Sequence, residues 1–134
     1  MLDVALHSDE GLIHLKDVAQ RQQISKKYLD HLIGRLEADG LLRAVRGAGG
    51  GVALSRPPSE ISLLDILRTL EGSFAPVECV DHPERCPRSA NCGARDLWVE
   101  MDELLTRFLG SLTLEDLCDR QRRKDEIAAL AYQI

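Results

Sequence analysis

The chain has 134 residues, of which 44% are hydrophobic and 29% are charged, a composition typical of a globular protein with one modest core. No apolar run approaches the roughly 20 residues needed to cross a bilayer, and the N-terminus lacks the basic start and long apolar stretch of a signal peptide. These features argue against a membrane or exported protein, so we expect a cytoplasmic chain with reduced thiols and no membrane partner.

Charge is unevenly distributed along the chain, although the net charge of −5 taken alone argues against a nucleic-acid partner. Residues 21–56 hold seven Lys or Arg and three Asp or Glu, whereas residues 57–134 hold nine basic and fifteen acidic residues. A basic segment on an acidic body is typical of a small DNA-reading face, which needs positive charge only where it meets phosphate. An ordinary solvated surface is the alternative.

Two helices are predicted in the first 40 residues. Residues 15–22 place apolar side chains on one side of a short helix, and Ser25 is well placed to cap a second helix that Gly40 ends. A pair of helices joined by a short turn, the second with a basic first turn, is typical of a helix-turn-helix. Helical hairpins also occur in proteins that never meet DNA.

A β-hairpin is predicted next, with strands over residues 41–45 and 52–55 separated by "RGAGGG". The turn contains four glycines: Gly47, Gly49, Gly50 and Gly51. They permit positive φ angles and a close approach of the backbone. A hairpin after a recognition helix is a wing, and Arg46 at its base can reach a minor groove. A phosphate-binding glycine loop is the less favoured alternative, because such loops lead into a helix and this one leads to a strand and "RPP".

The next helix is predicted to begin after Ser62, with Asp65 in a capping-box-like position, and to end at Gly72. Pro57 and Pro58 separate it from the wing. A cysteine-rich loop follows this helix.

A long helix is predicted over residues 94–112, where large apolar side chains recur at helical spacing: Leu97, Trp98, Met101, Leu104, Leu105, Phe108, Leu109 and Leu112. This stripe is wide for a surface helix, so we expect it to pack on a second copy of the chain as well as on its own domain. A core helix of a single chain is the alternative. Thr113 begins a further helix with a polar middle and an apolar end.

Three of the four cysteines lie in "CVDHPERCPRSANC". Thiolates are soft ligands that select zinc, copper(I) or iron–sulfur clusters. Zinc sites usually use cysteines two to four residues apart; here the gaps are six and five residues, which suit a larger object such as a cluster. We therefore interpret Cys79, Cys86 and Cys92 as metal ligands, with a further ligand still to be found. His82 is interpreted as solvated rather than as a ligand, and Cys118 as structural.

The segments "ISKKYLDHLIGRLEADGLLRAVRGAGGGVAL", "PPSEISLLDILRTLEG" and "CVDHPERCPRSANCGARDLWVEM" together resemble the bacterial winged-helix iron–sulfur transcription regulators of the IscR/NsrR family. The resemblance implies a homodimer in which the long helix after the cysteines crosses its partner. Each subunit would read one half of a near-palindromic promoter site in double-stranded DNA. The three cysteines would bind an iron–sulfur cluster, [2Fe–2S] being favoured over [4Fe–4S], which senses iron–sulfur supply, nitric oxide or redox state.

The chain departs from the family pattern near the cluster. Arg95 stands where IscR-like members place a histidine that completes the cluster, and arginine is not an ordinary ligand. NsrR-like members take an acidic or histidine ligand from the start of the first helix. In family members this helix is preceded by residues that have no counterpart before Met1. Val52 follows the wing glycines where an aromatic residue is common.

The resemblance places the DNA contacts on the second helix and the wing. We expect these residues to bind DNA: Ser25, Lys26, Lys27, Tyr28, Asp30, His31, Arg35, Arg46, Gly47, Gly49, Gly50 and Gly51. Asp30 matches a position where some members carry an acidic residue that biases the DNA motif accepted. Arg35 is either a positioning contact or a salt-bridge partner.

The predicted fold is mainly α with a small β-hairpin wing: a winged helix-turn-helix plus a long dimerisation helix. Residues 1–58 form the winged helix-turn-helix region, with a first helix shorter than in the family. Residues 59–93 form the linking helix and the cluster loop, and residues 94–134 form the dimerisation helix and a helical tail.

Two other functional classes fit the residues. One is a thiol-dependent or zinc-dependent regulator on the same fold, and the other is an iron–sulfur electron-transfer or accessory protein that does not bind DNA. We find no nucleophile–base arrangement, so we expect neither an enzyme nor a small-molecule substrate.

Overall fold

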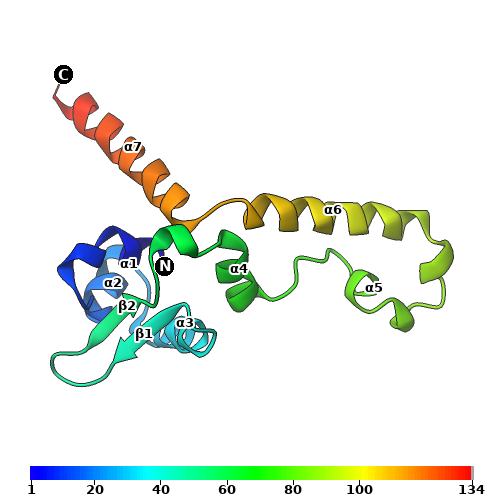
Figure 1. The fold of residues 1–134 in the computed structure, drawn as a ribbon, viewed down its shortest axis with the longest axis horizontal. Coiled ribbons are helices and arrows are strands. Elements are labelled where there is room, and N and C mark those ends of the chain that lie inside the picture. Colours follow the sequence, from blue (N-terminus) through cyan, green and yellow to red (C-terminus); the bar gives the residue numbers. More distant parts are fainter. Residues whose placement is uncertain (134) are drawn as a thin grey trace.

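The computed structural model describes residues 1–133 of the chain. This part is mostly helical with one two-stranded antiparallel sheet, which confirms the predicted fold class (Figure 1). The helices and strands are α1 (Leu2–Leu6), α2 (Leu15–Gln22), α3 (Lys26–Ala38), β1 (Leu42–Val45), β2 (Gly51–Leu54), α4 (Leu63–Glu71), α5 (Glu78–Asp81), α6 (Gly93–Gly110) and α7 (Leu114–Tyr132). None of these helices has the length and apolar composition needed to span a bilayer.

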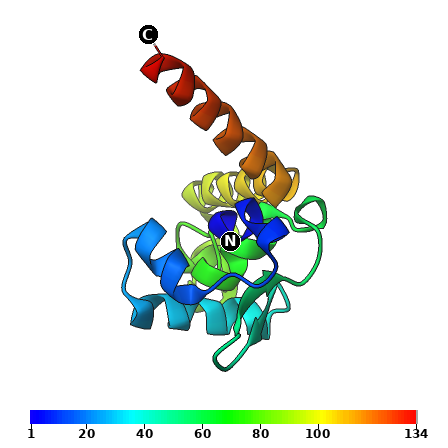
Figure 2. The ribbon, with the colours of Figure 1, turned by 90° about the vertical axis from the view of Figure 1, so that its left-hand side faces the viewer.

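The N-terminal elements form a head from which two helices project. α1, α2, α3 and the β1–β2 hairpin gather at one end of the molecule (Figure 1). α6 passes α4 and extends away from the head, and the cysteine loop with α5 lies along its far end. α7 starts at the head and projects in a different direction (Figure 2).

α2 and α3 form the predicted helix-turn-helix. The turn between them holds Gln23 in the left-handed region, with φ 53°. Ser25 caps α3, because its hydroxyl oxygen accepts a hydrogen bond of 3.1 Å from the backbone N–H of Tyr28. Leu29 and Ile33 then face the core on one side of α3. The opposite side of α3 is left exposed to solvent.

The β1–β2 hairpin is the predicted wing. Leu42 pairs with Leu54 and Val45 with Gly51, so the strands are shifted by one residue from the predicted bounds at three of their four ends. β1 begins after Leu41, because the N–H of Leu41 still closes the end of α3 with a 2.9 Å hydrogen bond to the Leu36 carbonyl oxygen.

A backbone bridge between Ile13 and Val52 anchors the hairpin to the segment before α2. Its two hydrogen bonds, from the N–H of each residue to the carbonyl oxygen of the other, are both 2.8 Å long. The wing is therefore fixed to the helix-turn-helix on the β2 side.

The core joins the head to the first turns of α7. The fully buried large side chains come from distant parts of the chain: Val4, Leu42, Val52, Ile61, Leu114 and Cys118. Thr113 and Asp116 form a capping box at the start of α7. The N–H of Leu114 donates to the Ile61 carbonyl oxygen at 2.8 Å, so the chain returns to the head after α6.

Candidate nucleic-acid interface and cysteine loop

A groove of about 580 Å³ lies between α3 and the wing. Lys16, Lys26 and Arg46 line it together with two carboxylates, Asp30 and Glu37. Nζ of Lys26 lies 3.0 Å from Oδ2 of Asp30, so this pair offsets its own charges. Oε1 of Glu37 accepts a hydrogen bond of 3.3 Å from the backbone N–H of Ala44 and so ties α3 to β1. Lys16 and Arg46 remain as cations with which the groove can meet phosphate.

The first turns of α3 present most of the predicted DNA contacts to solvent. The exposed residues are Ser25, Lys26, Lys27, Tyr28, Asp30 and His31. More than half of the surface of Tyr28 is exposed, although its side chain is large and aromatic, because it lies in the first turn of α3, away from the core. The Ser25 hydroxyl oxygen is engaged as the helix cap.

The wing glycines differ in what they do. Gly47 adopts a φ of 103° and accepts a 3.0 Å hydrogen bond from the N–H of Gly50, which closes the turn. Gly47 and Gly49 are exposed beside Arg46. Gly50 is buried, contrary to its expected place on the DNA-facing surface, because the Val45 carbonyl oxygen occupies the position that a Cβ would take.

Gly51 is required for a similar reason. A Cβ at Gly51 would come within 2.5 Å of the Ile13 carbonyl oxygen. Gly50 and Gly51 therefore serve the close backbone approach that shapes the wing, and Gly47 and Gly49 form its exposed tip.

Arg35 points toward α4 and not into the groove. Its Nη1 donates a hydrogen bond of 2.7 Å to the carbonyl oxygen of Leu70 in the last turn of α4. A second contact joins the same two helix ends, since the hydroxyl of Thr69 donates to Oδ2 of Asp39 at 2.6 Å. Arg35, which was predicted to contact DNA, instead links α3 to α4, the helix that leads to the cysteine loop.

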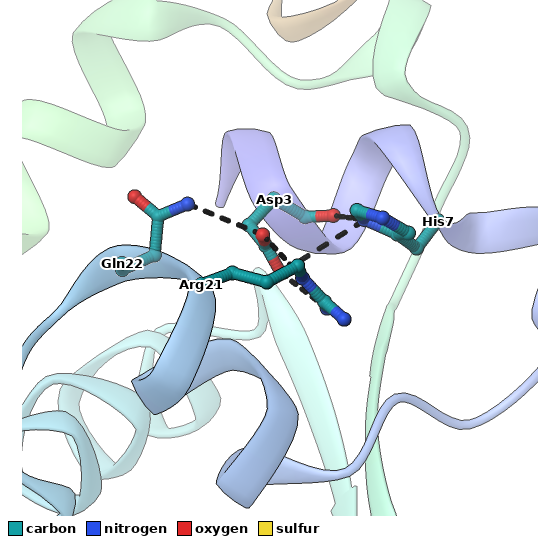
Figure 3. A network of polar contacts seen from close by, with 4 residues as sticks. All are labelled: Asp3, His7, Arg21 and Gln22. Carbon is teal, nitrogen blue, oxygen red and sulfur yellow. Dashed lines mark hydrogen bonds and ion pairs between the residues drawn. The ribbon is translucent and has the colours of Figure 1, made fainter.

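A buried carboxylate holds α1 against α2 (Figure 3). Asp3 is 7% exposed and accepts two hydrogen bonds from Arg21, 2.9 Å from Nε and 2.7 Å from Nη2. Gln22 donates a third at 3.2 Å, and the ring of His7 lies 2.8 Å from the Asp3 carbonyl oxygen. The hydrogen bonds from Arg21, and to a smaller extent the one from Gln22, hold the pKa of Asp3 below its usual value. Sequence reasoning missed this network; its one local signal is an acidic residue within the apolar "LDVAL".

The three loop cysteines are free and partly exposed. Cys79 lies in α5, Cys86 follows a short 3₁₀ turn, and Cys92 is the N-cap of α6. Arg85 pairs with Glu78 inside the loop.

The donor chemistry of this loop suits a soft metal centre, since three thiols are its only sulfur groups. Within residues 1–133, however, no three Cys, His, Asp or Glu side chains are gathered closely enough to hold a metal ion. His82 is half-exposed and lies 3.3 Å from the Glu84 carboxylate. The loop therefore offers suitable ligands for a soft metal centre, but a metal can bind only if the three thiols move closer to one another.

The buried fourth cysteine differs from these three. Cys118 is almost fully buried, and burial raises the pKa of its thiol. A protonated, inaccessible thiol is a poor ligand and a poor nucleophile. The expected structural role of Cys118 agrees with this placement.

An apolar stripe runs along one face of α6. It comprises Leu97, Met101, Leu104, Leu105 and Phe108. Leu104 is 59% exposed and Phe108 is 55% exposed, although both carry large apolar side chains. α6 also packs against α4. A contiguous exposed stripe of this kind is typical of a protein–protein interface.

The chain is similar to known transcription regulators over most of its length. The family model Rrf2, described as an iron-dependent transcriptional regulator, matches residues 1–120. The HTH-type transcriptional regulator IscR of Xenorhabdus nematophila is 40% identical over 125 residues, covering 93% of this chain and 76% of that protein.

Two solved structures share the fold. CymR, the global cysteine regulator of B. subtilis, has a TM-score of 0.71 and 34% identity, covering 89% of this chain and 87% of that one. IscR of T. potens has a TM-score of 0.71 and 34% identity, covering 90% of this chain and 78% of that one.

Proposed function

The chain belongs to the Rrf2 family of transcriptional regulators, and on this basis we propose that it is a homodimeric repressor or activator whose promoter affinity an iron–sulfur cluster controls. The observation that carries the proposal is a winged helix-turn-helix with three partly exposed thiols on one loop. Its named relatives are regulators and not enzymes. A regulator must share a compartment with the promoter DNA that it binds, which supports a cytoplasmic location.

DNA reading is assigned to the groove between α3 and the wing. The exposed first turns of α3, from Lys26 to His31, enter the major groove in this proposal, and Arg46 with the tip glycines meets the adjacent minor groove or backbone. The small number of free cations in the groove implies that base contacts and shape, more than bulk charge, set the affinity. Two such heads related by a two-fold axis read a near-palindromic site.

The cluster is assigned to Cys79, Cys86 and Cys92. A bound cluster supplies a group that changes oxidation state or is lost when it meets an oxidant or nitric oxide, and [2Fe–2S] is the favoured form. The chain's own residues would gather three thiolates around the cluster. A change in the conformation of the loop when the cluster binds or is lost would then alter the DNA-binding head.

The exposed stripe on α6 is assigned to the dimer. Two copies of α6 packed along Leu104 and Phe108 would remove these side chains from water, which is the main favourable term in association. The cysteine loop lies against the far end of the same helix, so the proposed dimer contact and the proposed metal centre share one element.

A thiol-dependent regulator is the second candidate. It is supported by the arrangement of the loop, because within residues 1–133 no three ligand side chains are gathered closely enough to hold a metal ion. In this case the loop cysteines would respond by oxidation and would hold no iron.

The deciding measurement is the iron, sulfide and zinc content of the protein purified without oxygen, together with its visible spectrum. About two iron and two sulfide per chain with broad visible absorption support [2Fe–2S], and about four of each support [4Fe–4S]. Zinc alone or no metal rejects the iron–sulfur proposal and favours the thiol regulator. Cys86→Ser is expected to lose the cluster while the protein remains dimeric.

DNA reading is tested separately with Arg46→Ala and a matched control. Arg43 lies three residues away and lines a different pocket, so Arg43→Ala makes the same charge change off the proposed interface. We expect Arg46→Ala to lower the affinity for the specific site about tenfold. The slope of log affinity against log salt concentration should fall in magnitude by about one. Equal effects of the two substitutions would reject the groove as the binding face.

A further inference from the structure

Arg95 contacts both the first and the last cysteine of the loop. It lies in the first turn of α6, where its backbone N–H donates to the Cys92 carbonyl oxygen at 3.1 Å. Its side-chain Nε donates to the Cys79 carbonyl oxygen at 2.9 Å, and this second bond is partly buried. One residue therefore connects the two ends of the loop.

The other side-chain bonds of the loop are local. Arg85 reaches Glu78, seven residues away, and the hydroxyl of Ser89 donates to the Pro83 carbonyl oxygen at 2.8 Å, six residues away. The Arg95 bond spans 16 residues. The local bonds shape turns inside the loop, whereas the Arg95 bond joins the segment where the loop begins to the helix where it ends.

We propose that Arg95 is a positioning residue that closes the cysteine loop before any group binds. Its side chain holds the backbone of Cys79 close to the N-terminal turn of α6, where Cys92 is the cap. Closing the loop in advance removes much of the entropy that a bound group would otherwise have to offset. The nature of the bound group rests on the proposed function, whereas the loop closure does not.

Arginine suits this role and not that of a ligand. Its guanidinium stays protonated and offers donors in a planar fork with no acceptor, so it binds a carbonyl oxygen well and a metal ion poorly. A lysine at the same position keeps the charge and one kind of donor but loses the fork. We therefore expect the loop of Arg95→Lys to stay closed more of the time than the loop of Arg95→Ala, but less than that of the unaltered chain.

The test compares Arg95→Ala, Arg95→Lys and a control, Arg88→Ala, in the metal-free protein. Arg88 is an exposed arginine of the same loop, so its substitution makes the same charge change without touching the connection to Cys79. Amide hydrogen exchange over residues 79–92, read by mass spectrometry, reports how often the loop opens. Melting temperature and circular dichroism establish that each variant is folded.

The unaltered chain and the three variants are then titrated with Co²⁺ alone, without oxygen, and thiolate-to-cobalt absorption gives the affinity. We expect Arg95→Ala to raise exchange in the loop about tenfold and to weaken Co²⁺ binding about tenfold, the size of effect that losing a charge-assisted hydrogen bond gives. Arg95→Lys should fall between Arg95→Ala and the unaltered chain, and Arg88→Ala should match the unaltered chain.

Unchanged exchange in Arg95→Ala would overturn the proposal, and so would an equal increase in Arg88→Ala. Faster exchange with unchanged Co²⁺ affinity would also overturn it, because the closure would then not position the thiols. Absence of any metal or cluster binding by the unaltered chain would instead reject the proposed function, and the exchange comparison in metal-free protein would still decide whether Arg95 closes the loop.

Discussion

Nη1 of Arg35 lies 2.7 Å from the carbonyl oxygen of Leu70, so the recognition helix is hydrogen-bonded to the last turn of α4. α4 packs on both α3 and α6. Its C-cap, Gly72, has a φ of 80°, and the chain beyond it leads into the cysteine loop. α4 therefore connects α3 to the segment that leads into the cysteine loop, and in the proposed function a rearrangement of the loop would reach α3 through α4.

The first prediction separates this link from a direct DNA contact. Arg35→Met and Lys27→Met each remove one positive charge from α3, but only Lys27 lies on its exposed first turn. We expect Lys27→Met to weaken DNA binding equally in the cluster-bound and metal-free forms. Arg35→Met should instead reduce the affinity ratio between the two forms, which for a coupling of ordinary size is about 5- to 150-fold. Fluorescence anisotropy at one salt concentration measures the DNA affinity of each variant in both forms. If Arg35→Met loses the same factor of affinity in the cluster-bound and metal-free forms, Arg35 is a DNA contact after all.

The second prediction concerns two neighbouring wing glycines. A Cβ at Gly50 would overlap the Val45 carbonyl oxygen, whereas a Cβ at Gly49 would meet nothing within 4 Å. Gly50→Ala must therefore displace backbone, and we expect it to lower the free energy of unfolding by about 1–3 kcal/mol. Gly49→Ala should change it by less than about 0.5 kcal/mol. Urea denaturation followed by circular dichroism provides the comparison, and equal stability of the two variants would show that the turn is not closed as the structure has it.

The parts of the fold that sequence predicts well are those specified by neighbouring residues. The Ser25 cap, the left-handed Gly40 and the helical spacing of the α6 stripe are all local signals, and each led to the correct element. The wing was also predictable, because a glycine-rich turn between two apolar runs has few other solutions.

The contacts that sequence did not predict join residues far apart in the chain. Arg35 bonds a backbone carbonyl 35 residues away, and Arg95 does so across 16 residues. A backbone carbonyl is present at every position, so no residue type marks the partner in advance. The burial of Gly50 has the same origin, since it depends on which carbonyl the folded wing brings against it.

The third prediction is a pH dependence of stability that originates at Asp3. The Arg21 pair lowers the pKa of Asp3 in the folded state, so the charged carboxylate stabilises the fold at pH values above its unfolded pKa of about 3.9. That contribution is lost as the pH falls through the lower pKa of the folded state.

Asp3→Asn measures this contribution directly. We expect it to lower the free energy of unfolding by about 2 kcal/mol at pH 7, because a partly buried charge-assisted pair is broken, and to differ little from the unaltered chain once the pH lies below the lowered pKa of the folded state. Asp9→Asn, at an exposed carboxylate near the same helix, is the control and should change stability little at either pH. A difference between Asp3→Asn and the unaltered chain that stays constant with pH would mean that lost packing, and not lost charge, explains the effect.

The fourth prediction tests whether the α6 stripe is a dimer interface. Leu104 lies at the centre of the stripe, whereas Arg107 is an exposed charged residue of the same helix. Leu104→Glu and Arg107→Gln each lower the net charge by one unit, but only Leu104→Glu would bury an unpaired carboxylate between two copies. We therefore expect Leu104→Glu to raise the dimer dissociation constant by about 100-fold or more, and Arg107→Gln to leave it nearly unchanged. Sedimentation velocity across a range of concentrations measures both. If Leu104→Glu sediments as the unaltered chain does, α6 is not the contact between subunits, and the two heads would have to be spaced on DNA by another surface.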